Sequence, residues 1–184
     1  VDRLSKEFDI EIEWKAFQIH PEAPPQGISF DDMGSDINRI RLAYLRASEL
    51  AGELGIKIKF PHYMSSSRLA LEIGQFAREK GKFQEFHDAV FHAYWQEGED
   101  IGNEALLLGI ADRVGLDPVE VREYINSAKA GEFLEQMAME AMELGVGGIP
   151  TIFIGDILRV EGVQPYEFIS MAVKKALAMQ ANDR

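Results

Sequence analysis

The sequence predicts an α/β fold in which a large all-helical insertion separates two parts of one small sheet domain. Apolar and polar residues alternate over residues 10–17, which is the pattern of a strand with one buried face. From residue 31 to residue 144 the apolar residues follow helical spacing instead. After this stretch, two short apolar runs flank a Gly-Asp pair and lead into a last amphipathic helix, which predicts an antiparallel hairpin packed against a helix.

The composition is that of a folded protein with an acidic surface. The 184 residues are 46% hydrophobic, enough for one domain with a sizeable core or for a small domain with a large insertion. The formal net charge of −12 repels phosphate groups, so we expect neither a nucleic acid nor an anionic membrane as partner. Since no stretch approaches the about 20 apolar residues of a membrane span, and no signal pattern opens the chain, we expect a cytoplasmic protein.

The chain contains no cysteine, which excludes a disulfide framework and a thiol nucleophile within these residues. Its histidines are not spaced as metal ligands. His87 and His92 are five residues apart, so on one helix they would point to different faces. His20 and His62 each lie beside a proline in loop-like sequence. We therefore expect no metal site, and no catalytic residue in the given chain.

Residues 1–30 form the N-terminal part of the predicted sheet domain. Apolar residues at helical spacing predict a helix at the start of the chain, followed by the strand over residues 10–17. Residues 18–27 contain three prolines and a glycine and form a loop. Nothing before Val1 can cap the first helix, and there is no initiator methionine. We therefore expect the natural chain to extend upstream.

Residues 31–144 form the helical insertion in this prediction, and residues 145–184 return to the sheet domain as a hairpin and a helix. The clearest helix start is at Asp117, because an N-cap aspartate is followed by Pro118 in the first turn and by Glu120 at the capping-box position. Apolar periodicity and glycine stop signals predict helices at residues 32–54, 83–97, 103–115 and 131–144, and one that starts at residue 117. A further helix runs to Lys80, with N-cap candidates in the serine cluster at residues 65–67.

This order of elements is that of the thioredoxin fold, provided that one more strand precedes the first helix. In that layout the additional strand lies in the middle of the sheet, between the strand at residues 10–17 and the strand at residues 151–154. Without it, two sheet fragments would each expose unpaired backbone groups and apolar side chains. The sequence therefore predicts a thioredoxin-like fold whose first strand is absent from the given sequence.

Several segments resemble, in order, the FrnE-like branch of the DsbA-type oxidoreductases. The resemblance implies a thiol-disulfide oxidoreductase or isomerase, with a Cys-x-x-Cys pair a few residues upstream of Val1. At a helix N-terminus the pKa of the first thiol would be lowered, so that the thiolate could attack a disulfide. The segments that carry the resemblance are residues 12–21 (IEWKAFQIHP), 67–82 (SRLALEIGQFAREKGK), 86–98 (FHDAVFHAYWQEG), 143–153 (ELGVGGIPTIF) and 160–165 (VEGVQP).

The resemblance also implies a substrate-binding position. Pro150 matches the cis proline of thioredoxin-fold proteins, and the residue before it, Ile149, presents its backbone to an extended substrate segment. The implied substrate-binding residues are Gly148, Ile149, Pro150 and Thr151, with Phe17 and His20 at the possible rim of the site. The expected partner is a thiol- or disulfide-containing protein or small molecule, and no cofactor is expected.

Two other functions remain open from the residues alone. The glutathione-dependent 2-hydroxychromene-2-carboxylate isomerases share this fold with a helical insertion, and glutathione would then be the cofactor. A redox-inert thioredoxin-like module that holds peptides would agree with the lack of cysteine. The VEGVQP segment favours the oxidoreductase branch. The sequence determines neither the physiological substrate, nor the redox direction, nor the oligomeric state.

Overall fold

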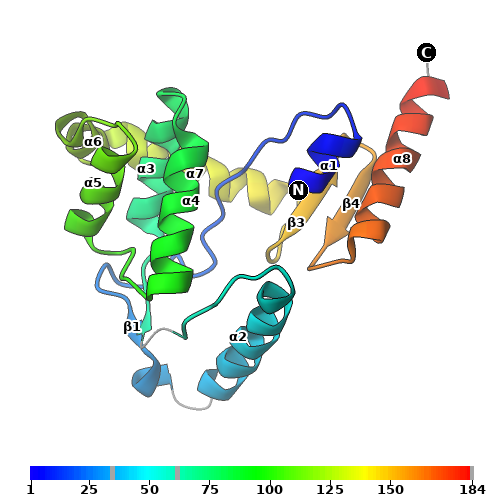
Figure 1. The fold of residues 1–184 in the computed structure, drawn as a ribbon. Helices are drawn as coiled ribbons and strands as arrows, with labels where there is room; N and C mark the ends of the chain where they lie inside the picture. The colour runs from blue at the N-terminus through cyan, green and yellow to red at the C-terminus, as the bar shows by residue number, and fades with distance from the viewer. Residues whose placement is uncertain (34–35, 61–62, 183–184) are drawn as a thin grey trace. The chain divides into compact units, whose positions relative to one another are not determined.

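A computed structural model describes residues 1–33, 36–60 and 63–182 of the chain (Figure 1). The chain divides into two compact units, and each is described here by itself. One unit consists of Val1–Ile19 with Met137–Arg184, and the other of His20–Gln136. In the described part of the chain, no helix has both the length and the apolar character needed to cross a membrane. The division of the chain at residues 30 and 144 stays a prediction.

Helices make up most of the unit from His20 to Gln136. Its two short strands, β1 and β2, pair antiparallel, with Ile28 opposite Met64 and Ser29 opposite Tyr63. The last helix, α7, continues beyond Gln136 into the other unit. The elements in chain order are β1 Ile28–Ser29, η1 Phe30–Met33, α2 Asp36–Glu53, β2 Tyr63–Met64, α3 Arg68–Glu79, α4 Phe83–His92, the π-helical turn η2 Ala93–Glu97, α5 Glu104–Arg113, α6 Pro118–Ile125 and α7 Ala128–Glu143.

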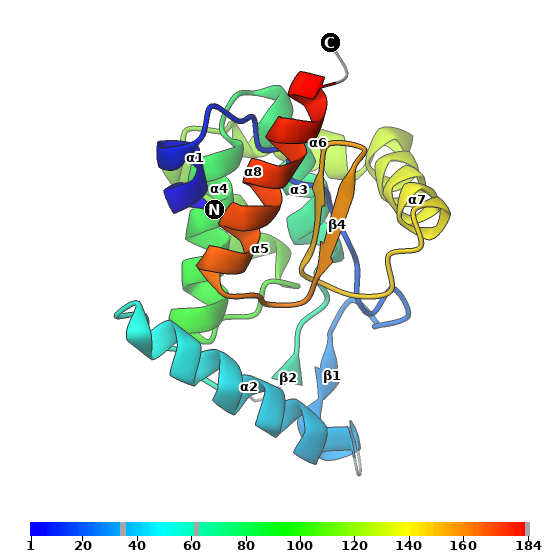
Figure 2. The same cartoon turned by 90° about the vertical axis from the view of Figure 1, so that its right-hand side faces the viewer.

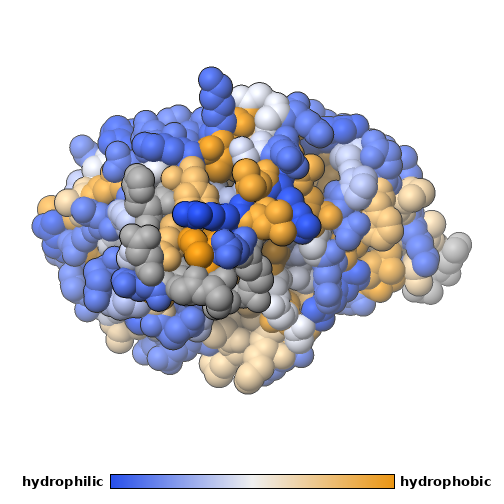
Figure 3. All heavy atoms as spheres, turned by 90° about the horizontal axis from the view of Figure 1, so that it is seen from below, coloured by the Kyte–Doolittle hydropathy of each residue, from blue (hydrophilic) through white to orange (hydrophobic). Residues whose placement is uncertain are grey.

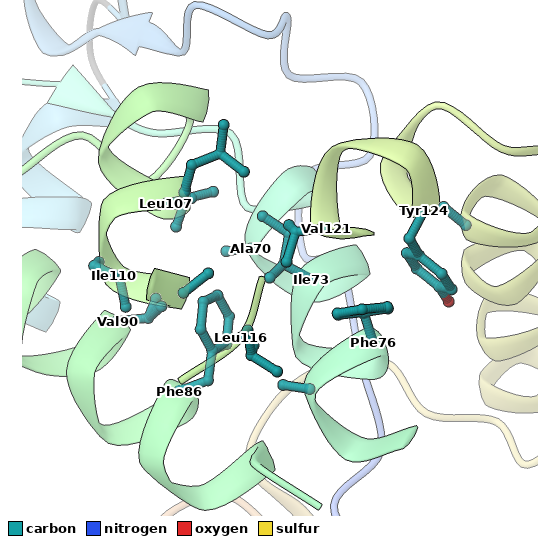
Figure 4. Packing of buried hydrophobic residues seen from close by; sticks show 14 of the residues in the cluster. Ala70, Ile73, Phe76, Phe86, Val90, Leu107, Ile110, Leu116, Val121 and Tyr124 are labelled. Carbon is teal, nitrogen blue, oxygen red and sulfur yellow. The ribbon is translucent and has the colours of Figure 1, made fainter. Parts of the chain in front are cut away.

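The main hydrophobic core lies among α3, α4, α5 and α6 (Figure 4). Each of these helices contributes an apolar face, and the largest fully buried side chains are Phe86, Ile73, Leu107, Ile110 and Val121. The helix start predicted at Asp117 is confirmed, because its carboxylate accepts a hydrogen bond of 2.8 Å from the Val119 backbone N–H. The periodic apolar residues of the predicted insertion therefore do form one packed helical core.

Removal of the Phe86 ring tests this core. The side chain is 2% exposed and contributes from α4 to the centre of the cluster. Because truncation leaves a cavity as well as removing buried apolar surface, we expect Phe86→Ala to lower the free energy of unfolding by about 3–5 kcal/mol. Urea denaturation followed by far-UV circular dichroism measures the change. The exposed Phe91, truncated in the same helix, should cost far less, and equal losses would contradict the assignment.

Helix α2 contacts the rest of its unit through aromatic rings. The ring of Tyr44 lies 4.8 Å from that of Phe60 and 5.3 Å from that of Trp95, measured between centroids. The Tyr44 and Tyr94 hydroxyl groups are 3.0 Å apart, and burial raises the pKa of both phenols. Leu42 and Leu45 of α2, and Leu54 just after the helix, are exposed. Figure 3, which views the molecule from below, shows hydrophobic residues at the surface among hydrophilic ones.

The other unit contains α1 Asp2–Glu7, β3 Thr151–Ile154, β4 Leu158–Glu161 and α8 Tyr166–Asn182. Strands β3 and β4 pair antiparallel with Thr151 opposite Glu161 and Phe153 opposite Arg159. Helix α8 lies along this hairpin in both ribbon views (Figures 1 and 2). Its inward face includes Val173 and Ala176, which are buried like Val160 of β4. The predicted hairpin and last helix are therefore confirmed.

Two predicted details of this unit are wrong. Residues 10–17 were expected to form a strand, but they make no ladder with any described strand. An extended segment becomes a strand only through hydrogen bonds to a neighbour, and the described residues supply none there. The hairpin turn is also longer than the predicted Gly-Asp pair, because Ile154 lies opposite Leu158 and leaves residues 155–157 as the loop.

Helix α1 is attached to α8 by the carboxylate of Glu7. This group accepts hydrogen bonds from the hydroxyl groups of Tyr166 and Ser170, and it forms an ion pair of 3.1 Å with the Lys174 ammonium. The guanidinium of Arg3 lies 3.6 Å from the centroid of the Tyr166 ring. The bond from Tyr166, followed by that from Lys174, lowers the pKa of Glu7 below its ordinary value of 4.5. The interactions therefore favour the ionised carboxylate in the folded protein.

The contact between α1 and α8 should weaken in acid. A carboxyl group whose pKa is lowered by folding stabilises the folded state above its ordinary pKa, 4.5, and loses this contribution as pH falls through the lowered value. We expect the amide protons of α1 to exchange faster, relative to the intrinsic rate, as pH falls below that range. In Glu7→Gln this pH dependence should be absent. If wild type and variant respond to acid alike, another group is responsible.

Candidate functional site at the Ile149–Pro150 corner

The predicted substrate-binding residues lie where the chain enters β3. The Ile149–Pro150 peptide bond is cis in the structure. Two hydrogen bonds hold the segment around it. The Pro150 carbonyl accepts a bond of 2.8 Å from the Gly162 backbone N–H just after β4, and the Thr151 hydroxyl donates one of 2.7 Å to the Gly148 carbonyl. The corner is therefore fixed at both sides of Pro150.

Both the side chain and the backbone of Ile149 are accessible at the surface. The residue is 54% exposed, although isoleucine is usually buried. Its backbone N–H and carbonyl have no hydrogen-bond partner among the described residues. Within that same part of the chain, β3 pairs with β4 alone. The other edge of β3 is where the strand predicted upstream of Val1 would pair. An extended substrate segment could pair with the main-chain groups of Ile149 itself, directly before β3.

The loop that precedes the corner is anchored at the end of α7. The Val146 N–H binds the Ala141 carbonyl at 2.8 Å and the Gly145 N–H binds the Met142 carbonyl at 3.0 Å. With Gly145 at a φ of +64°, this is a Schellman motif, in which glycine ends the helix in the left-handed conformation. Residues 144–150 therefore leave α7 in a defined direction.

Arg159 of β4 completes this anchor from the hairpin. Its guanidinium donates hydrogen bonds to the carbonyls of Leu144 at 2.9 Å and Gly145 at 2.7 Å, and forms an ion pair of 2.6 Å with Glu161. The sequence analysis did not identify this role. A signal was present, because the last turn of α7 has no basic residue to interact with its carbonyl groups. The position of Arg159 opposite Phe153 emerges only from the strand register.

Among the described residues, no hydrogen bond or ion pair connects either predicted rim residue, Phe17 or His20, to the Ile149–Pro150 corner. Phe17 is half-buried and belongs to the same unit as Pro150. His20 belongs to the other unit, where its imidazole lies 3.1 Å from the Glu22 carboxylate. Their role at the rim stays a prediction. His62 lies outside the described residues. In the ranges that are described, no three potential ligands among His, Cys, Asp and Glu gather as they would around a metal ion.

Substitution of Arg159 tests how the corner is held. We expect Arg159→Met to lower the free energy of unfolding of this unit by about 1 kcal/mol, because two carbonyl groups at a partly exposed helix end lose their donor. Amide exchange should accelerate over residues 145–149. Arg159→Lys retains the charge but not the forked donor geometry, so it should recover only part of the loss. Full recovery by lysine would show that charge alone is sufficient.

The hairpin covered by α8, the helical unit and the proline corner together define a thioredoxin-like domain with a helical insertion. The sequence matches the DSBA-like thioredoxin domain over residues 1–174. The chain therefore belongs to the DSBA-like thioredoxin domain family, and the fold predicted from its sequence is confirmed.

Relatives by sequence include proteins with and without a named activity. An uncharacterized protein of Bacillus subtilis strain 168, YwbO, is 30% identical over 151 residues, which are 80% of this chain and 74% of that protein. A 2-hydroxychromene-2-carboxylate isomerase of Pseudomonas putida is 27% identical over 120 residues, and the match spans 64% of this chain and 59% of the isomerase. The isomerase of that name from Sphingobium xenophagum is 33% identical over 82 residues, 44% of this chain and 42% of that protein.

Two solved structures have a closely similar fold. A probable DsbA oxidoreductase from Streptomyces coelicolor superposes with a TM-score of 0.79 at 19% identity, covering 89% of this chain and 74% of that one. A 2-hydroxychromene-2-carboxylate isomerase superposes with a TM-score of 0.75 at 21% identity, covering 100% of this chain and 89% of that one. At these identities the likeness establishes the fold alone.

Proposed function

We propose that the protein is a thiol-disulfide oxidoreductase of the DsbA type. Its redox-active Cys-x-x-Cys pair would lie upstream of Val1, because the given chain contains no cysteine. The observation that carries the proposal is the open backbone of Ile149, directly before the cis Pro150. A substrate segment bound there in extended form would be held by main-chain hydrogen bonds, which do not depend on its sequence.

The chemistry of the proposed reaction is disulfide exchange. The first cysteine, as thiolate, attacks one sulfur of the substrate disulfide, forms a mixed disulfide and releases the other substrate sulfur as a thiolate. The second cysteine then attacks the mixed disulfide, so that the protein dithiol is oxidised and the substrate disulfide is reduced. The reverse sequence oxidises a substrate dithiol. In this proposal the corner holds the substrate backbone, and no cofactor takes part.

A second function is favoured by the names of several relatives. Three of the relatives by sequence are named 2-hydroxychromene-2-carboxylate isomerase. In that case we propose glutathione as cofactor, with serine in place of the first cysteine of the upstream pair. The two functions differ in the substrate that the Ile149 corner receives, a polypeptide or other disulfide compound in one case and a small aromatic carboxylate in the other.

Expression of the complete reading frame separates these functions. We expect the full protein to catalyse the reduction of insulin disulfides by dithiothreitol, and replacement of the first upstream cysteine by serine to abolish the activity. The 184-residue chain serves as a negative control, since it contains no thiol. A reading frame without Cys-x-x-Cys before Val1 contradicts the proposal. Glutathione binding by calorimetry, with turnover of 2-hydroxychromene-2-carboxylate, would favour the isomerase instead.

A further inference from the structure

Most methionines of the chain lie in the unit formed by Val1–Ile19 and Met137–Arg184. This unit contains five of the seven methionines and neither histidine nor cysteine. Thioethers are therefore its only soft metal-binding groups. Within the described ranges, His, Cys, Asp and Glu gather at no metal site, but methionine is outside that set of ligands. The methionines of this unit are residues 137, 139, 142, 171 and 179.

Two of these methionines form an exposed pair near the end of α7. Met139 is 54% exposed and Met142 is 75% exposed, although methionine is usually buried. They are three residues apart on one helix, which places their Cβ atoms about 5–6 Å from each other. Because the side chain is unbranched and has three rotatable bonds, both sulfur atoms can turn toward one ion while the helix stays unchanged.

The exposed methionines of α8 form no such pair. Met171 is 62% exposed and Met179 is 42% exposed. They are eight residues apart, about 12 Å along the helix axis. The two helices thus present thioethers of similar exposure in two arrangements, paired on α7 and isolated on α8. This difference provides a control within the same unit.

The charges around the pair favour a cation. Glu143 follows Met139 by four residues, so its exposed carboxylate lies on the same face of α7, and none of the described residues forms an ion pair with it. The last turn of α7 has no basic residue, and the negative end of the helix dipole attracts positive charge there. Arg159 reaches this helix end, but its charge is balanced by the Glu161 carboxylate at 2.6 Å.

From the paired thioethers and this electrostatic environment we propose that Met139 and Met142 bind one Cu(I) ion, with the Glu143 carboxylate balancing its charge. Thioethers are soft donors and select Cu(I), whereas Mg²⁺ and Ca²⁺ prefer oxygen ligands. A thioether carries no proton that the metal must displace, unlike a thiol or an imidazolium. The site is independent of disulfide exchange and adds a soft-metal function to the protein.

Silver(I) is the probe, because it has the charge and softness of Cu(I) and is not oxidised by air. The complete protein is used, with any upstream cysteine replaced by serine so that no thiolate competes for the metal. The ¹³C-labelled methyl resonances of the methionines are followed in a chloride-free buffer. We expect those of Met139 and Met142 to shift together and to saturate at about one equivalent of silver. Those of Met171 and Met179 should not move in this range.

Matched variants test the pair. M139L/M142L retains the apolar volume and removes both sulfur atoms, so we expect the affinity for silver, measured by calorimetry, to fall at least about tenfold. M171L/M179L removes the same number of exposed thioethers from α8 and should bind silver like wild type. Glu143→Gln should weaken binding about twofold to threefold. Far-UV circular dichroism checks that each variant is folded.

The pH dependence separates thioether from imidazole ligands. Between about pH 7 and about pH 5.5 a thioether does not titrate, so the affinity should stay constant, whereas a site at His87 or His92 would lose affinity as the imidazole is protonated. A loss of affinity at the lower pH would therefore overturn the proposal. So would unchanged affinity in M139L/M142L, or methyl shifts of Met171 equal to those of Met139, because binding would then be adventitious.

Discussion

The guanidinium of Arg159 is the connection on which the candidate site depends. It comes from the middle of β4 and reaches the carbonyl groups at the end of α7, so that the hairpin and the helix are fixed to each other through one side chain. The glycine-ended Schellman turn sets the direction of the chain as it leaves α7, and the bonds around Pro150 set its direction as it enters β3. The exposed backbone of Ile149 lies between the Schellman turn and the bonded segment around Pro150, and both of them fix its position.

The two units differ in how their stability is obtained. The helical unit has a contiguous core of large side chains from four helices, with Phe86 at its centre. In the other unit the hairpin is covered on one side by α8, and α1 is attached through the Glu7 carboxylate and the Arg3–Tyr166 contact. Polar contacts at exposed positions contribute less than buried apolar area. The site is therefore on the unit with the smaller core.

Some of the exposed apolar side chains lie at the Ile149 corner, on β3 and at the end of α7. Ile149, Phe153 and Met142 all face the surroundings, although residues of these types are usually buried. The open edge of β3 is where the strand predicted upstream of Val1 would pair, and that pairing would remove an edge that otherwise favours aggregation.

The sequence by itself determined the elements and their order. Periodicity identified the helices around Phe86 and Val121, and capping residues located the start at Asp117. The two short apolar runs around the Gly-Asp pair identified the hairpin. All of these signals are local properties of the chain. Tertiary structure decided the rest. Residues 10–17 have the pattern of a strand but not the neighbour that a strand requires. The role of Arg159 likewise depends on the register that places it near Leu144, fifteen positions away in sequence, and on a contact that no local pattern records.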